Sequence, residues 1–336
     1  MGSFRPSLPP AVAAVRAAVR AVLPADGLVL IALSGGPDSL ALLSAAVFEA
    51  PGRVGAVIVD HGLQEGSDAV AERARQQAES LGSVFSRVVR VTVPEGSGLG
   101  PEAAARKARY DALSSVAVEA GAVAVLLGHT LDDQAETVLL GLARGSGAGS
   151  LQGMAPVAGL YRRPLLGIRR SVTVQACADQ GLEPWDDPHN DDPAYTRVRV
   201  RRKVLPVLEA ELGPGVAEAL ARTAESLRED EEAFATMIDE VAEELAEHIE
   251  AGVAVPAAAL AANPAALRQR IIRFVVQSEF GVSLSRVHTL EVARLVTDWH
   301  GQGPVDVPGV RVTRSGGRIE FRSRSGEQSG EASGHD

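Results

Sequence analysis

The sequence predicts an α/β protein with a doubly wound, mostly parallel sheet, followed by a smaller, mainly helical C-terminal domain. In the first part of the chain, apolar runs of strand length alternate with helical patterns, which is typical of a parallel sheet covered on both faces. A glycine-rich turn follows the first apolar run and opens into a helix, and ligands bind at such turns in these folds. From Ala194 onward the pattern becomes largely helical.

The individual elements follow from the same spacing. An Ala/Val-rich segment that carries Arg16 and Arg20 predicts an amphipathic N-terminal helix. The predicted strands cover 28–33, 54–60, 84–93 and 123–127, the helices cover 37–48, 67–81, 101–120, 131–143 and 170–180, and glycine-rich loops cover 95–100 and 145–153. Ser34, Asp60 and His129 fall at the ends of three predicted strands, so we expect them to line one crevice.

The length and composition indicate one large domain and a smaller one. A chain of 336 residues with 46% hydrophobic content can bury a sizeable core. We place the domain boundary near Gly213, which predicts domains over 1–213 and 214–322 and a disordered polar tail over 323–336. Apolar residues recur at helical spacing between 220 and 245, and short strands are expected over 305–321.

Composition also excludes several classes of protein. No apolar run is long enough to span a bilayer, so we expect a soluble, cytosolic protein without a membrane partner. The single Cys177 excludes an intrachain disulfide and a multi-cysteine metal site within one chain. The formal net charge of -10 argues against a surface that is basic all over, although a local basic face remains compatible with one RNA contact.

The glycine-rich turn predicts a phosphate site. Gly35 and Gly36 allow the backbone to approach a ligand, Pro37 suits the first helical position, and unpaired N–H groups at a helix start favour an anion. The Walker lysine is absent, and Asp38 stands beside the expected phosphates, which indicates a bridging Mg2+. The alternative is a turn in which Ser34 or Asp38 only helps the helix to start.

Three carboxylates begin the predicted helix at 131–143. Asp133 and Glu136 are three residues apart and share a helix face, where they could bind a metal, accept a lysine ammonium or act as a base. The alternative is acidic capping, with Thr130 as N-cap and Asp133 at the favoured third position. For the isolated segment, capping is the better interpretation.

Basic residues and histidines form a second group of candidates. Arg106 and Arg109 are three apart on a predicted helix and could both bind phosphate, although a solvated helix face is the simpler interpretation. The densest basic run could contact RNA or form a solvated face, and it comprises Arg197, Arg199, Arg201, Arg202 and Lys203. His61, His129 and His189 lack metal-ligand spacing, so we do not expect a histidine metal cluster.

The motifs together resemble the PP-loop ATP pyrophosphatases, and among them the tRNA(Ile)-lysidine synthetases. The segment 34–39, SGGPDS, resembles the PP-loop itself. The further matching segments occur in the family's order at 60–63, 102–110, 129–137, 144–147, 163–166 and 187–206. The resemblance departs from the family pattern at Gln64, His189 and Val198, and the C-terminal part is shorter than in the longest family members.

The resemblance implies a ligase that uses ATP and Mg2+. It adenylates the wobble cytidine of a tRNA(Ile) with a CAU anticodon, and the amine of free L-lysine then displaces AMP. It assigns 1–213 to catalysis, 214–322 to tRNA recognition, and Asp38 to the metal. The implied catalytic residues are Asp38, Asp133, Glu136, Arg106 and Arg109. The implied nucleotide contacts are Ser34, Gly35, Gly36, Pro37, Asp38, Ser39, Asp60, His61 and His129. The basic run from Arg197 to Lys203 is implied to hold tRNA.

Three alternatives stay open on the sequence. One is another PP-loop adenylating enzyme such as a tRNA thiolase, which the lone Cys177 disfavours because such enzymes commonly need several cysteines or a sulfur-carrying partner. The second is a noncatalytic nucleotide- or tRNA-binding module, which the intact Asp38, Asp133 and Glu136 disfavour. The third concerns assembly, since both a monomer and a homodimer agree with the sequence.

Overall fold

The computed structural model describes residues 8–62, 66–92, 100–145, 148–187, 192–250 and 252–324. These form two compact units, which divide between Arg228 and Glu229. The boundary predicted near Gly213 falls just before the long helix α10 (Val216–Leu245), and the division of function between the two parts stays a prediction. His189, most of the loop at 95–100 and most of the C-terminal tail lie outside the described residues.

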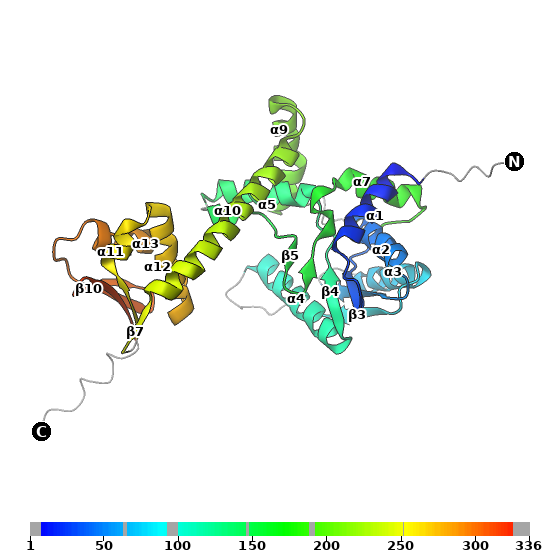
Figure 1. The fold of residues 1–336 in the computed structure, drawn as a ribbon. Helices are drawn as coiled ribbons and strands as arrows, with labels where there is room; N and C mark the ends of the chain where they lie inside the picture. Colours follow the sequence, from blue (N-terminus) through cyan, green and yellow to red (C-terminus); the bar gives the residue numbers. More distant parts are fainter. Residues whose placement is uncertain are drawn as a thin grey trace, which may run out of the picture. The chain divides into compact units, whose positions relative to one another are not determined.

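The first unit is built on a six-stranded, mostly parallel sheet with the strand order β3-β2-β1-β4-β6-β5 (Figure 1). The strands β1 to β4 and β6 pair in parallel, and β5 is an antiparallel edge strand. The strands are β1 Leu28–Ala32, β2 Val54–Asp60, β3 Ser86–Arg90, β4 Ala122–Leu126, β5 Val157–Ala158 and β6 Tyr161–Arg162. The predicted parallel α/β sheet is therefore confirmed.

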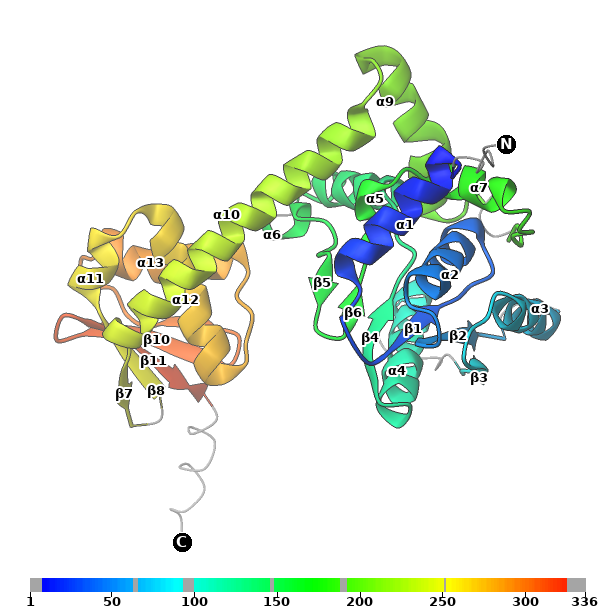
Figure 2. The ribbon, with the colours of Figure 1, turned by 45° about the vertical axis from the view of Figure 1, so that its right-hand side comes forward.

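Helices cover both faces of this sheet (Figure 2). Apolar side chains of α1, α2, α3 and α7 pack against one face in a single core cluster, and Leu113, Val116 and Ala117 of α4 pack against the other face. These helices are α1 Pro10–Val22, α2 Pro37–Glu49, α3 Ser67–Ser80, α4 Pro101–Glu119 and α7 Arg170–Asp179. Helix cover on both faces makes the sheet doubly wound, as the alternation of elements predicted.

A further group of helices packs around α5 (Leu131–Ala143). Leu131 and Ala135 of α5 share a core cluster with Val200, Leu205 and Ala217, which brings the basic run of the sequence close to the acidic start of α5. The remaining short elements of this unit are α6 Ala148–Leu151, η1 Pro164–Gly167, α8 Thr196–Arg199, the π-helical turn η3 Val200–Val204 and α9 Leu205–Leu212.

The second unit combines helices with a five-stranded antiparallel sheet of order β7-β8-β11-β10-β9. The predicted strands near the C-terminus are present, with the β10–β11 hairpin turning at Gly316 and Gly317. The strands β7 and β8 were not predicted, because each is short and no turn signal of the Asn-Gly type separates them. The elements are β7 Glu247–Ile249, β8 Gly252–Pro256, α11 Ala257–Ala262, α12 Ala265–Phe280, α13 Arg286–Thr297, β9 Val305–Val307, β10 Val310–Ser315 and β11 Arg318–Ser323.

Among the described residues, none of the helices combines the length and the apolar character that crossing a membrane requires.

Candidate active site

The turn between β1 and α2 has the geometry of an anion site. Gly35 has a φ of 84°, which a residue with a side chain rarely adopts, and Pro37 occupies the first turn of α2. The Ser39 hydroxyl accepts a bond from the Ser34 N–H at 3.2 Å and donates to the Gly36 carbonyl at 3.0 Å. Hydrogen bonds within the turn therefore stabilise it, and the free N–H groups at the start of α2 can bind a phosphate.

Gly128 lets the end of β4 approach this turn closely. A Cβ atom at Gly128 would lie 3.1 Å from the Asp38 carbonyl carbon and from the Ser39 nitrogen. Such a contact is tighter than real Cβ atoms normally make, so a larger residue would displace the start of α2. The sequence placed Gly128 next to His129 at the end of a predicted strand, but it did not predict this close approach, which depends on packing between distant segments.

A pocket of about 300 Å³ opens beside the turn, at the carboxyl ends of β1 and β2. Its lining includes Ser34, Asp60, His61, Arg109 and Trp185. Three of the predicted nucleotide contacts therefore meet in one pocket. The Asp60 carboxylate accepts a bond from the Gly62 N–H at 2.9 Å. Burial raises the pKa of Asp60, but this bond, a bond from Ser67 and the charge of Arg90 lower it more. The pKa therefore lies below the usual range, and the group is an anion.

Positive charge gathers between this pocket and the end of β4. Burial lowers the pKa of His129 to about 3, against the attraction of Asp133, and Arg109, Arg163 and Arg106 lower it further, so the imidazole is neutral at neutral pH. Burial also lowers the pKa of Arg109, beside Arg106 and Arg197. Within the described residues, the buried Nδ1 atoms of His61 and His129 and the Nε atoms of Arg109 and Arg163 have no hydrogen-bond partner.

The cationic group consists of Arg106, Arg109 and Arg163, and the imidazoles of His61 and His129, whose pKa values are lowered by burial, lie beside it. Buried polar groups normally have a partner, and guanidinium groups prefer phosphate or carboxylate oxygens. An anion is the ligand that fits. Arg163 was not among the predicted site residues, although its segment matched the family pattern.

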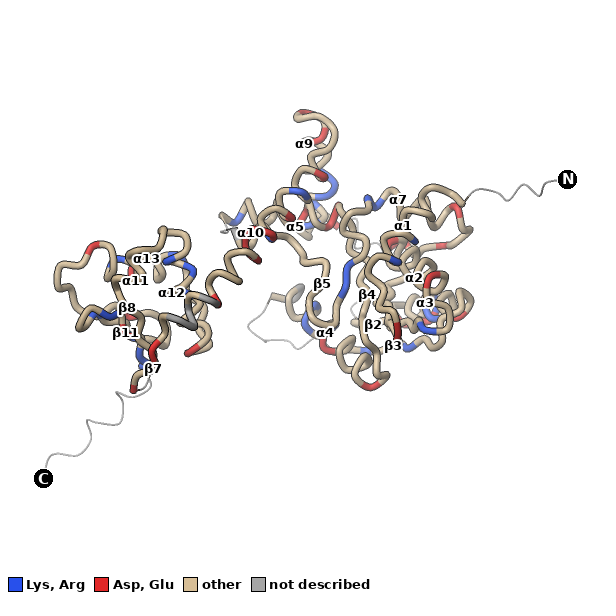
Figure 3. Tube along the Cα trace, in the orientation of Figure 1, with Lys and Arg blue, Asp and Glu red and all other residues tan. Residues whose placement is uncertain are grey.

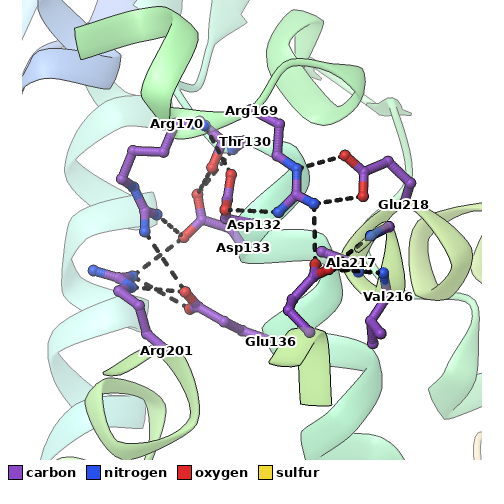
Figure 4. A network of polar contacts seen from close by, with 12 residues as sticks. Thr130, Asp132, Asp133, Glu136, Arg169, Arg170, Arg201, Val216, Ala217 and Glu218 are labelled. Atoms are coloured by element: carbon purple, nitrogen blue, oxygen red, sulfur yellow. Dashed lines mark hydrogen bonds and ion pairs between the residues drawn. The ribbon is translucent and has the colours of Figure 1, made fainter. Parts of the chain in front are cut away.

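Three carboxylates converge on the other side of the turn. The Arg170 guanidinium lies 2.8 Å from Asp133 and 3.6 Å from Glu136 (Figure 4). It also lies 3.1 Å from Asp38. The Asp38 carboxylate also accepts a bond from the Thr173 hydroxyl. The structure thus joins the metal candidate Asp38 to the two lysine candidates, which the sequence had treated as separate groups.

Asp133 caps α5 and also pairs with Arg170. Its Oδ2 accepts bonds from the Thr130 N–H at 2.8 Å and from the Thr130 hydroxyl at 2.9 Å, which completes a capping box at the start of α5. Its Oδ1 faces Arg170. Although burial opposes ionisation, Arg170 and Thr130 hold the pKa of Asp133 below its usual range.

Glu136 is fully buried and is paired with Arg201. The guanidinium of Arg201 donates to the two carboxylate oxygens of Glu136 at 2.7 and 3.2 Å and lies 3.5 Å from Asp133 (Figure 4). Burial raises the pKa of Glu136, and the bonds from Arg201 oppose that shift. Burial likewise raises the pKa of Asp38, against Arg170 and Thr173. A buried carboxyl group with a raised pKa is a better proton acceptor at neutral pH.

The basic run therefore faces two directions. Arg201 points to Glu136, and Arg197 lies 4.0 Å from the same carboxylate. Arg199, Arg202 and Lys203 are exposed on the segment that leads into α9, where Figure 3 shows Lys and Arg in blue. Only Arg199, Arg202 and Lys203 have the exposure that a contact with RNA phosphate needs. The spacing in the sequence could not separate these side chains from the inward-facing arginines.

Arg169 and Asp132 form a neighbouring network outside the carboxylate cluster. Arg169 binds Asp132 at 3.4 Å and Glu209 at 3.1 Å, and it also pairs with Glu218. The Arg170 N–H donates to Asp132 at 2.7 Å. These contacts hold the start of α7 against α5 and α10, which fixes the position of Arg170.

The donor chemistry of Asp38 fits a magnesium ion that is shared with phosphates. Mg2+ prefers one or two carboxylates together with substrate phosphate oxygens and water, and the Asp38 carboxylate lies in the first turn of α2, beside the anion site. Among the described residues, no group of three or more His, Cys, Asp or Glu side chains forms a complete metal cage. Asp38 is therefore suited to a metal only when phosphate oxygens supply further ligands.

The comparisons with known proteins agree with this geometry. The PP-loop domain family matches residues 14–208, and the TilS substrate binding domain matches residues 256–320. The U34-tRNA thiolase NcsA from Methanococcus maripaludis, with its [4Fe-4S] cluster, superposes with a TM-score of 0.55 at 20% identity, covering 65% of this chain and 79% of that one. That likeness establishes the fold alone. The fold and the turn define a PP-loop enzyme that uses ATP.

The more specific family follows from whole-chain similarity. The tRNA(Ile)-lysidine synthase of Leifsonia xyli subsp. xyli is 64% identical over 298 residues, which are 88% of this chain and 89% of the relative. The enzyme of the same name from Thermobifida fusca is 52% identical over 312 residues, covering 90% of this chain and 94% of the relative. The chain belongs to the tRNA(Ile)-lysidine synthase family.

Proposed function

We propose that this protein ligates L-lysine to C2 of the wobble cytidine of tRNA(Ile) with a CAU anticodon, through an adenylated tRNA. The products are lysidine, AMP and pyrophosphate. Membership of the tRNA(Ile)-lysidine synthase family supports the overall reaction. The observation that carries the mechanism is the meeting of two oppositely charged groups at one phosphate-binding turn, the cationic group around Arg109 and the carboxylates around Arg170.

In the first step, the cytosine O2 attacks the α-phosphorus of ATP and pyrophosphate leaves. The N–H groups at the start of α2 would hold the pyrophosphate, and Arg106 and Arg109 would stabilise negative charge that develops on the phosphates. The pocket lined by Asp60 and His61 would take the nucleoside. Asp38 would hold Mg2+, which supplies positive charge to the phosphates.

In the second step, the lysine amine attacks C2 of the adenylated cytosine and AMP leaves. Only the neutral amine is nucleophilic, so a base must remove a proton from the ammonium form. Asp133, which stays ionised, is suited to binding the ammonium group, and Glu136, whose pKa is raised by burial, is suited to accepting the proton. The proton passes from the amine to the Glu136 carboxylate, and the leaving AMP takes the electron pair of the C2–O bond.

The RNA contacts follow from exposure. The exposed Arg199, Arg202 and Lys203 are suited to backbone phosphates, and the second unit, which contains the substrate-binding-domain match, would add further contacts. An anticodon base is already single-stranded, so it can enter the site without disruption of a duplex. A protein that uses tRNA and ATP as substrates would act in the cytoplasm.

The burial and the raised pKa of the single cysteine disfavour the thiolase alternative. Cys177 is buried, it donates to the Pro37 carbonyl at 3.4 Å, and burial together with Asp38 raises its pKa to about 11. The thiolate that sulfur chemistry requires is therefore scarce at neutral pH.

The test is incubation of the full-length protein with unmodified tRNA(Ile) transcript, ATP, Mg2+ and isotopically labelled lysine. The expected result is a labelled lysidine nucleoside in the digested tRNA, together with one AMP and one pyrophosphate per lysine incorporated. A matched transcript in which the wobble cytidine is replaced by uridine serves as the control. Incorporation of label into the control, or AMP formation without lysine incorporation, would reject the proposed reaction.

A further inference from the structure

Arg170 fills the centre of the carboxylate cluster. Its guanidinium contacts the carboxylates of Asp38, Asp133 and Glu136, and its side chain is only 22% exposed. A guanidinium group stays protonated in proteins, so this cation is permanent. Burial lowers the pKa of Arg170, but the three carboxylates raise it by more, so the net pKa lies above the usual value.

The ammonium group of lysine would need the same place. A cation that is held between Asp133 and Glu136 must lie close to oxygens that Arg170 already contacts at 2.8 and 3.6 Å. Arg201 contacts both oxygens of Glu136 at 2.7 and 3.2 Å, and Arg197 lies 4.0 Å from one of them, so both oxygens already face a guanidinium group. Two cations at contact distance repel each other strongly in a partly buried site. Lysine and Arg170 therefore cannot both keep their full contacts.

Arg170 is also linked to the nucleotide site. Its Nε lies 3.1 Å from Asp38, which belongs to the first turn of α2 and so lies beside the N–H groups that are suited to phosphate. A guanidinium group binds phosphate at least as well as it binds a carboxylate, because two of its N–H groups match two phosphate oxygens. A bound nucleotide thus offers Arg170 an alternative anion a short distance away.

We infer that Arg170 is an internal competitor of lysine, which blocks the lysine site in the free protein and moves to the phosphates when ATP binds. The inference rests on the proposed function, because it takes Asp133 and Glu136 as the lysine ligands. It makes lysine binding ordered: nucleotide binds first and lysine second. In the absence of nucleotide, the same arginine keeps the three carboxylates together.

The experiment measures lysine binding to the full-length protein by isothermal titration calorimetry, with and without α,β-methylene-ATP and Mg2+. In the wild type, the nucleotide analogue should tighten lysine binding by about tenfold or more, the usual weight of one charge-assisted contact. Arg170→Met should bind lysine tightly without nucleotide, and the analogue should add little. Arg87→Met is the matched control, since it removes an arginine from a carboxylate outside the cluster, that of Glu119, and should keep the wild-type dependence on nucleotide.

Arg170→Lys is the second variant, in case the methionine variant does not give a cooperative thermal transition. Its shorter ammonium side chain can contact fewer of the carboxylates, so the effect of nucleotide on lysine binding should be smaller than in the wild type. The inference is overturned if free Arg170→Met binds lysine no more tightly than the free wild type, or if Arg170→Lys keeps the full nucleotide effect.

Asp133→Asn separates failure of this inference from failure of the proposed function. If Asp133→Asn loses lysine binding while Arg170→Met gains none, the carboxylate binds lysine and only the competition is wrong. If Asp133→Asn and Glu136→Gln both bind lysine like the wild type, lysine binds elsewhere, and both the inference and the proposed use of these carboxylates are wrong.

Discussion

Replacing Glu136 by glutamine is expected to impair lysine transfer far more than adenylation. Glutamine keeps the length of the side chain and one carbonyl oxygen, so the contact with Arg201 is weakened rather than abolished. The negative charge and the ability to accept a proton are lost. Because the PP-loop turn and the cationic group around Arg109 do not depend on Glu136, ATP should still react with the tRNA.

The magnitude follows from the burial of the group. Removing one partner of a buried ion pair costs about 3–5 kcal/mol when the other charge is left uncompensated. Here the Arg201 and Arg170 side chains are 25% and 22% exposed, and Asp133 still contacts both. We therefore expect a loss of only about 1–2 kcal/mol in the free energy of unfolding. Loss of a charge-assisted contact to lysine should slow transfer by about one to two powers of ten.

The assay is a single-turnover reaction that separates adenylated tRNA from the lysidine product at several lysine concentrations. Glu136→Gln should accumulate the adenylate and require more lysine. The rate of lysine transfer should also no longer fall at acidic pH, because the group that accepts the proton is gone. Glu49→Gln is the matched control, because Glu49 pairs with Arg20 through both carboxylate oxygens, outside the carboxylate cluster. Collapse of adenylation with an unchanged requirement for lysine would refute the reasoning and would assign Glu136 to ATP.

Three further predictions concern separate parts of the protein. Asp38→Ala should keep the circular dichroism spectrum but abolish adenylate formation, and wild-type AMP formation at limiting Mg2+ would contradict the metal role. Replacing Arg202 and Lys203 by alanine should weaken tRNA binding more than ATP binding and reduce the salt slope by up to about one logarithmic unit per contact, whereas an unchanged slope would place the tRNA elsewhere. His129 has a pKa of about 3 when folded against 6.5 when free. Since the unfolded chain then binds the extra proton, stability should fall below about pH 6.5 by at most about 1.4 kcal/mol per pH unit, and His129→Gln should reduce the loss of Tm between pH 7 and pH 5. An equal loss of Tm in the wild type and in His129→Gln would contradict the role of His129 in this pH dependence.

The sequence was most informative where one segment carries both pattern and chemistry. The predicted strand at 54–60 and helices at 37–48 and 131–143 coincide with β2, α2 and α5 to within one residue, because apolar periodicity reports local burial directly. The turn that contains Gly35 was also predicted, since its glycines, its proline and its position after a strand are all local features.

The centre of the site was not predictable in the same way. Arg170 is 132 residues from Asp38 along the chain, and Arg201 is 65 residues from Glu136. Such pairs depend on how α7 and η3 pack against α5, which periodicity does not report. The exposed arginines of the basic run and its inward-facing members likewise look alike in sequence. The close approach of Gly128 to the start of α2 was not predicted for the same reason, because it is a contact with another element.

The measurement that tests the central claim most directly is pyrophosphate release in the absence of lysine. If ATP first adenylates the tRNA, the protein with excess ATP and tRNA(Ile) should release up to one pyrophosphate per tRNA, while AMP stays attached to the RNA. Addition of lysine should then release AMP and form lysidine at the same rate. If pyrophosphate appears only after lysine is added, or without tRNA, the sequence of steps assigned to the two charged groups is wrong.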